Sequence, residues 1–349
     1  AREAVELREI ECRLTYDPIT KKVTADYAFG KDPAILQNNF KQVARIALGV
    51  EKLLKKRGLL LDYNAVMLDM LVRGVIRELS WDELTAWGDK PFNFISHHMV
   101  LKESISTPLR IVANSSLDNN NSGISLNDCL LKGPSSLTPL LEVLVSFRNR
   151  KEVCIWDLKK AYNSILSSIG NQHLRRLVWR WGEEDKEFTV YALATVMFGD
   201  KPAGLILELV KKMARELGKE ICPRTCEDML LGSYVDDSSG GGEREDIERL
   251  MGSVTMDDNG KLQYSGTVSQ VMATVGMEVK VMIDSFCTDE KALELYGGQF
   301  IGHNWEPTRD LLEFAYIVNT ANKKNKLKVQ PDITPETVDL ILEAILTLR

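Results

Sequence analysis

The segment Tyr234-Val235-Asp236-Asp237 constrains the fold of this chain more than any other. Two adjacent carboxylates follow an aromatic and an apolar residue, and the apolar stretch before them begins at Leu230. This pattern predicts a buried hairpin that carries acidic residues at its tip. Because neighbouring side chains of a strand point to opposite faces, both carboxylates reach one site only if the tip of the hairpin bends.

A third carboxylate, Asp157, ends an apolar run of strand length that starts at Val153. Carboxylates that a fold brings together repel one another and take up protons unless cations hold them. Two divalent cations are the usual device for in-line displacement at phosphorus. The sequence therefore predicts a metal site formed by Asp157, Asp236 and Asp237, with Asp236 as the main ligand. The alternative for the Asp-Asp pair is a solvated turn, which the apolar residues before it disfavour.

The chain has 349 residues, of which 44% are apolar, which is enough for a core and suggests two or three subdomains. Its net charge is −6, from 44 Lys and Arg against 50 Asp and Glu. An acidic chain does not fit the simple expectation for a nucleic-acid-binding protein. Since only the surface that faces phosphates must be basic, the total charge weakens such a function and leaves it open.

Neither a membrane-spanning apolar stretch nor a signal peptide is visible, so we expect an intracellular protein without a membrane partner. The chain begins with Ala1 and ends with Arg349 inside a helical pattern, which suggests a segment of a longer protein. Cys222 and Cys226 are the only cysteines at a metal-binding spacing, and without a second pair we expect free thiols.

The apolar pattern also predicts the secondary structure around these acids. Apolar residues at helical spacing predict helices within residues 43–54, 66–75, 137–148, 160–181 and 199–213. Short apolar runs predict hairpins within residues 94–114 and 302–314. Gly199 opens the loop before one of these helices, where a glycine lets the backbone approach a ligand closely.

Three of these segments resemble the motifs of reverse transcriptases, in the same order and with similar spacing. They are residues 155–162 (IWDLKKAY, motif A), 198–204 (FGDKPAG, motif B) and 234–237 (YVDD, motif C). Further stretches are similar to the polymerase of Bel-Pao type long-terminal-repeat retrotransposons: residues 97–102, 110–116, 125–134 (SLNDCLLKGP) and 302–307, the last matching the primer grip. The likeness runs from about Asn38 to the C-terminus.

The resemblance implies an α+β right-hand polymerase with fingers, a palm made of an antiparallel sheet packed on helices, and a truncated thumb. The implied division is an N-terminal helical region and fingers (1–133), palm with motif A (134–165), fingers (166–197), palm with motifs B, C and D and the primer grip (198–317), and the start of the thumb (318–349). It also implies an RNA template, a DNA primer and deoxynucleoside triphosphates as partners. Ribonuclease H and integrase domains of the same polyprotein would lie outside this chain. The protein itself would be located in the cytoplasm or in a virus-like particle.

In such an enzyme Asp157 and Asp236 would bridge two Mg²⁺ ions, or Mn²⁺ in their place, with Asp237 in support. The implied reaction is RNA-directed and DNA-directed DNA synthesis at a primer 3′-hydroxyl. The ring of Tyr162 would lie under the sugar and exclude a 2′-hydroxyl. The alternative for Tyr162 is a ring packed against the palm.

The other implied substrate contacts come from basic residues and from Gly199. Arg110 would bind the triphosphate with help from Lys102, because a guanidinium suits phosphate oxygens. Lys280 would protonate the leaving pyrophosphate, or it is a solvated strand lysine. Two positions depart from the family pattern, since Asn114 replaces a common aspartate and Phe198 replaces a common glutamine.

Nucleic-acid contacts are implied at two places near the C-terminus. Gly302 and Trp305 belong to the segment that resembles the primer grip. Lys323, Lys324 and Lys326 form a basic cluster that suits the phosphates of a template–primer duplex, and its alternative is a solvated linker.

Two other functions compete with a DNA polymerase. An RNA-dependent RNA polymerase shares the palm, but there we would expect a small or acidic residue in place of Tyr162. A domesticated, inactive polymerase-like protein would only bind RNA or act as a scaffold. A scaffold has no use for three converging acids, so their joint presence argues against it.

Overall fold

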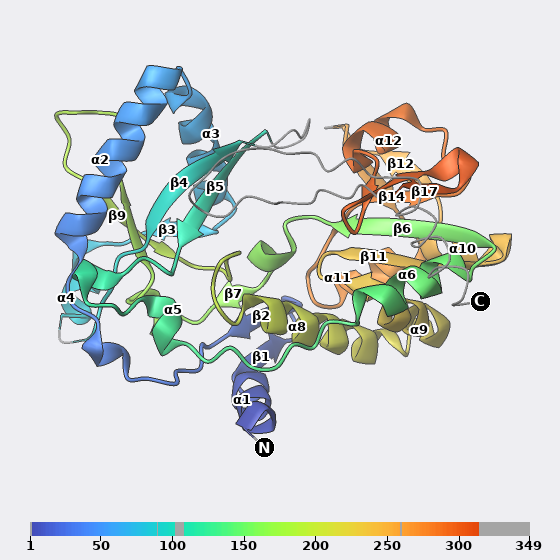
Figure 1. The fold of residues 1–349 in the computed structure, drawn as a ribbon, viewed down its shortest axis with the longest axis horizontal. Helices are drawn as coiled ribbons and strands as arrows, with labels where there is room; N and C mark the ends of the chain where they lie inside the picture. The colour runs from blue at the N-terminus through green and yellow to red at the C-terminus, as the bar shows by residue number, and fades with distance from the viewer. Residues whose placement is uncertain (1, 89, 102–107, 259, 314–349) are drawn as a thin grey trace, which may run out of the picture.

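The computed structural model describes four stretches of the chain, residues 2–88, 90–101, 108–258 and 260–313. They form a mixed fold of helices and small, mostly antiparallel sheets (Figure 1). The expected combination of helices with antiparallel sheets is therefore confirmed.

The sheet that carries the acidic segments has four antiparallel strands. In spatial order they are β10 (Ser233–Tyr234), β11 (Asp237–Gly242), β6 (Glu152–Leu158) and β14 (Val279–Asp284). Residues 153–156 of β6 are all buried, as suits apolar, β-branched and aromatic side chains in the middle of a sheet. The strand predicted over residues 153–157 is thus confirmed. It extends to Leu158 and is one of the two inner strands of this sheet.

Helices pack around this sheet and fix its position. They are α6 (Leu140–Arg148), α8 (Ala203–Gly218), α9 (Pro223–Leu231), α10 (Arg244–Met251), α11 (Thr267–Ala273) and α12 (Glu290–Tyr296). Helices α9 and α10 contact β11, α12 contacts β14, and α8 packs on α9 and α11. In Figure 1, α8 and α9 lie below β6 and α12 lies above it.

A second group of elements lies beside this sheet, on the left of Figure 1. It contains α2 (Phe40–Arg57), α3 (Leu60–Val72), α4 (Trp81–Ala86), the hairpin β4 (Ser96–Leu101) and β5 (Leu109–Asn114), and the sheet β3 (Ile76–Glu78), β9 (Thr189–Leu193) and β8 (Arg176–Trp179). Helix α2 contacts β4 and β8, and α3 contacts β5. The hairpin and both long helices predicted here are confirmed.

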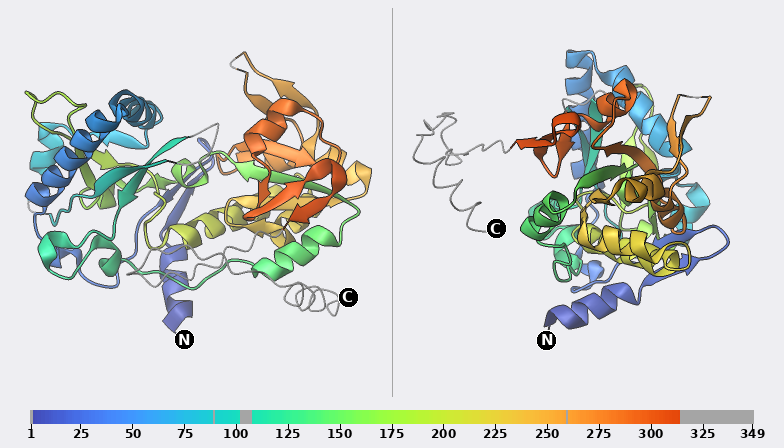
Figure 2. Two further views of the ribbon diagram at one scale, coloured as in Figure 1. Left: turned by 45° about the horizontal axis from the view of Figure 1, so that its top comes forward. Right: turned by 90° about the vertical axis from the view of Figure 1, so that its right-hand side faces the viewer.

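The remaining elements are short. They are α1 (Arg2–Glu11), β1 (Leu14–Asp17), β2 (Lys22–Ala25), α5 (Leu126–Cys129), β7 (Leu166–Ser167), α7 (Ile169–Gln172), β12 (Val254–Met256), β13 (Leu262–Tyr264), β15 (Gln299–Phe300), β16 (His303–Glu306), β17 (Leu311–Glu313) and the 3₁₀ turns Pro33–Ile35, Asn119–Asn121, Ala161–Ser164 and Pro307–Arg309. The hairpin β12–β13 projects from the body of the molecule (Figure 2).

The helix predicted over residues 160–181 is wrong. This stretch contains the 3₁₀ turn Ala161–Ser164, then β7, α7 and β8. The apolar residues 177–179 of β8 pair with β9, and Lys160 has a left-handed backbone with φ of 50°. Pairing with a distant strand outweighed the helical spacing, as it often does where β-branched and aromatic residues gather.

The expected strand at Leu230 and Leu231 is also wrong, because both residues end helix α9. Cys226 and Met229 lie one helical turn apart and are buried, whereas both leucines are exposed. The first strand of the acidic hairpin is therefore only the two residues of β10.

Within the described residues, the structure contains no helix long and apolar enough to span a bilayer. All six cysteines are free thiols, as expected for Cys222 and Cys226.

Gly232 is the point where α9 turns into the acidic hairpin. The Ser239 N–H donates to its carbonyl at 2.9 Å, so the two backbones lie against each other. A Cβ at Gly232 would lie 1.9 Å from the Ser239 carbonyl oxygen, and backbone atoms cannot move aside cheaply. The hairpin therefore requires a glycine here.

Gly232→Ala should lower the free energy of unfolding by about 2 kcal/mol or more, because the added methyl group forces the hairpin away from α9. Gly204→Ala in the exposed first turn of α8 is the matched control, since its Cβ would meet no atom within 4 Å. Denaturant unfolding of both variants measures the difference. Equal stability of the two would contradict the packing described for the hairpin.

Candidate active site

Strand pairing brings the three predicted aspartates to one place. Asp157 on β6 lies directly opposite Asp237 on β11. Residues directly opposite each other in an antiparallel pair present their side chains on the same face of the sheet. Asp236 lies in the loop before β11, and all three line one cavity of about 910 Å³.

The tip of the hairpin is bent at Val235. Tyr234 pairs with Asp237, so Val235 and Asp236 alone form the loop. Val235 has a φ of 54°, in the left-handed region that a β-branched residue rarely adopts. In a regular strand the side chains of Asp236 and Asp237 would point to opposite faces. The bend at Val235 allows both to reach one site.

The acids form a site with excess negative charge. Burial, followed by the charges of Asp236 and Asp157, raises the pKa of Asp237 to about 7. The Ile301 N–H donates to the Asp237 Oδ2 at 3.2 Å and opposes this rise. Burial also raises the pKa of Asp157, while Lys280 and Arg110 lower it.

Lys280 pairs directly with Asp157. Its Nζ lies 3.0 Å from the Asp157 Oδ2, and both side chains are less than one-third exposed. The register of β14 shifts between Val279 and Val281, so Lys280 sits at an irregularity of the strand. A bulge of this kind redirects a side chain, here toward the acids. Lys280 is thus a partly exposed strand lysine whose ammonium is paired within the cavity.

The chemistry of the donors fits Mg²⁺ or Mn²⁺. Carboxylate oxygens are the ligands these ions prefer, and unbalanced negative charge is what a divalent cation relieves. In the described part of the chain, however, no group of three or more His, Cys, Asp or Glu is already arranged around a metal position. The ammonium of Lys280 pairs with the Asp157 Oδ2, so a metal at this carboxylate would bind its other oxygen or displace Lys280.

Arg110 and Gly302 line the same cavity as the acids. Arg110 comes from β5 in the neighbouring group of elements, and Gly302 comes from the turn between β15 and β16. Two predicted substrate and nucleic-acid positions thus join the acids from opposite parts of the chain.

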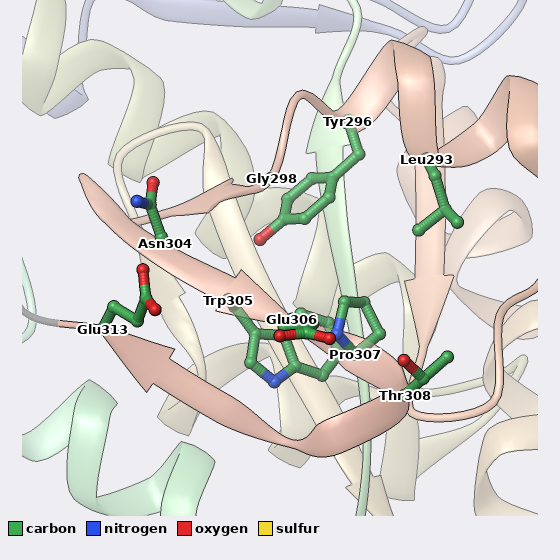
Figure 3. A pocket seen from close by; sticks show the side chains of 9 residues that line it. All are labelled: Leu293, Tyr296, Gly298, Asn304, Trp305, Glu306, Pro307, Thr308 and Glu313. Atoms are coloured by element: carbon green, nitrogen blue, oxygen red, sulfur yellow. The ribbon is translucent and has the colours of Figure 1, made fainter.

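Trp305 does not line this cavity and is only 2% exposed. Its ring packs against Phe147 with centroids 5.4 Å apart, and its indole N–H donates to Asp310 at 3.2 Å. It lines a second pocket of about 360 Å³ together with Tyr296 (Figure 3). The expected contact of Trp305 with nucleic acid is corrected, because the buried ring instead anchors the hairpin β16–β17.

Tyr162 lies beside the acids without lining the cavity. Its ring meets the exposed ring of Phe198 edge to face, with centroids 5.9 Å apart. Burial raises the pKa of Tyr162 to about 12, and the charges of Asp236 and Glu208 contribute. The side chain of Tyr162 is therefore close enough to Asp236 to interact electrostatically with its carboxylate.

A buried network that the sequence did not reveal holds the loop of Gly199. Gly199 has a φ of 104°, and Asp200 beside it is buried. Asp200 pairs with Arg175 at 2.6 Å and accepts hydrogen bonds from Tyr27 and Ser115, also at 2.6 Å. Tyr27, Ser115 and Arg175 are distant from Asp200 in the sequence, so no local pattern predicts their contact. The only local sign of the network is the aspartate that follows Gly199.

Four of the predicted site residues lie outside the described residues. They are Lys102, Lys323, Lys324 and Lys326. The expected start of the thumb, residues 318–349, lies outside them as well.

In comparisons with known proteins, no protein-family model matches the chain and no curated protein is detectably similar to it. The candidate site is therefore interpreted from its own residues.

Asp237→Asn should be more stable than the wild type at pH 8 without divalent cations, by about 1–3 kcal/mol. A carboxyl whose pKa is about 7 when folded holds its proton more tightly than in the unfolded chain. The contribution of the Asp237 carboxyl to the free energy of unfolding is thus complete below about pH 4, and it is lost as the pH rises to 7. Asparagine does not titrate, so the difference should vanish at low pH. Urea unfolding across this range measures it, and a difference independent of pH would contradict the assigned charge coupling.

Proposed function

We propose that the chain is the polymerase part of a reverse transcriptase similar to those of Bel-Pao type retrotransposons, with the fingers, palm and thumb of a right hand. It would extend a DNA primer with deoxynucleotides on an RNA or DNA template. The observation that carries the proposal is the shared cavity of Asp157, Asp236 and Asp237, with Arg110 and Lys280 at the same cavity. Three carboxylates with two cationic side chains suit phosphoryl transfer between nucleotides.

The three aspartates would hold two Mg²⁺ ions. When bound, such ions favour the ionised primer hydroxyl and neutralise charge on the phosphates. Arg110 would orient the triphosphate through its guanidinium fork. The 3′-hydroxyl would lose its proton to solvent water as its oxygen bonds to the α-phosphorus and the bond to pyrophosphate breaks. Lys280 would leave Asp157 and give a proton to the departing pyrophosphate.

One observation favours a second candidate, an inactive polymerase-like protein that binds RNA or partners. In the Lys280–Asp157 ion pair, the lysine ammonium neutralises a carboxylate charge that a catalytic metal would otherwise neutralise. In an inactive protein this pair would be permanent, whereas in the proposed enzyme Lys280 would leave it to protonate the pyrophosphate. An RNA-dependent RNA polymerase is less well supported because of the ring of Tyr162.

Asp236→Asn should lower primer extension on an RNA template by roughly 100-fold or more, the usual loss when one group acting on transition-state charge is removed. The assay uses Mg²⁺ and deoxynucleotides. Asp62→Asn, on the exposed surface of α3, is the matched control and should extend like the wild type. Equal extension by the wild type and Asp236→Asn would refute the proposed function.

Tyr162→Ala should raise ribonucleotide incorporation relative to deoxynucleotides by about ten-fold or more, because the space beside the sugar opens. Tyr162→Phe keeps the ring and should retain the wild-type preference. Single-nucleotide extension with each triphosphate measures the ratio. If the alanine variant discriminates as well as the phenylalanine variant, Tyr162 has no role in sugar selection.

A further inference from the structure

Helix α8 carries a lysine on its buried face. Lys211 is 1% exposed, and its neighbours on the same face, Leu207 and Ala214, are buried apolar residues. An ammonium group in such surroundings costs free energy unless its protons are paired. A lysine at this position therefore needs a physical reason.

The partners of Lys211 supply one. Its Nζ donates to the Glu208 carboxylate at 2.8 Å and to the backbone carbonyl of Val235 at 2.6 Å. The first bond stays within the helix, whereas the second reaches the tip of the acidic hairpin. Hydrogen bonds from a charged donor are short and stronger than neutral ones. Burial lowers the pKa of Lys211, and the charges of Glu208 and Asp236 oppose this.

Val235 is the residue whose left-handed backbone bends the hairpin. A β-branched residue keeps this conformation only where its surroundings enforce it. The Val235 carbonyl shares a rigid peptide plane with the N–H of Asp236. A donor that fixes this carbonyl therefore also fixes the direction in which Asp236 leaves the turn.

We infer that Lys211 is a positioning residue of the active site. Its ammonium holds the carbonyl of Val235, stabilises the strained turn and keeps Asp236 directed into the cavity shared with Asp157 and Asp237. The inference rests on the proposed function only in that Asp236 there serves as a metal ligand.

Three variants and one control test this inference. Lys211→Met keeps the length of the side chain and removes its donor. Glu208→Gln combined with Lys211→Met also avoids an unpaired carboxylate, and Lys211→Arg keeps a cation. Lys212→Met is the matched control, because Lys212 is exposed and pairs with Glu11 at 2.9 Å on the surface.

Titration with MnCl₂ in a calorimeter reads the metal site. Lys211→Met and the double variant should bind Mn²⁺ about ten-fold or more weakly, the usual effect of losing a charged hydrogen bond. Lys211→Arg should recover part of the affinity, and Lys212→Met should equal the wild type. A melting curve of each variant separates this effect from unfolding. Wild-type affinity in both Lys211→Met variants would overturn the inference.

Hydrogen exchange of the peptide spanning residues 231–239 reads the turn without metal or reaction. Exchange should be faster in Lys211→Met and in the double variant than in Lys212→Met, and equal exchange would overturn the inference whatever the polymerase assay gives. A wild-type protein that extends no primer, in spite of the expected exchange rates, would refute the proposed function and leave Lys211 as the holder of the turn.

Discussion

The register of β6 against β11 is the constraint on which the site depends. It sets Asp157 opposite Asp237, on one face of a sheet whose centre is buried. A shift by one residue would turn one of these side chains to the other face and separate them. The buried side chains of residues 153–156 and the backbone contact of Gly232 with Ser239 resist such a shift. Packing of the residues next to the acids therefore determines the distance between them.

This arrangement concentrates negative charge, and the fold compensates for it from several directions. Lys280 pairs with Asp157, the Ile301 N–H donates to Asp237, and Lys211 lies behind the turn of Asp236. The pKa of Asp237 remains raised to about 7, so the compensation is incomplete. An incompletely neutralised group of carboxylates is poised to take up either protons or metal ions.

The sequence predicted the convergence of the acids because the signal was local. An apolar run before Asp157, and another before Asp236 and Asp237, indicates strands that end in carboxylates. Sequence-based prediction of the secondary structure failed where the partner that decides it is distant. Residues 177–179 form a strand because β9 pairs with them. Leu230 belongs to a helix because Cys226 and Met229 form the buried face of that helix. Lys211 was accessible in principle, as a lysine on the apolar face of a helix, but its partner Val235 was not.

The central claim is that Asp157, Asp236 and Asp237 form one binding site for divalent cations. Anomalous scattering from crystals grown with MnCl₂ tests it most directly, because it locates the ions without any assay of activity. We expect Mn²⁺ peaks in the cavity within coordination distance of Asp157 and Asp236. Crystals that hold Mn²⁺ only elsewhere would contradict a metal site at these aspartates.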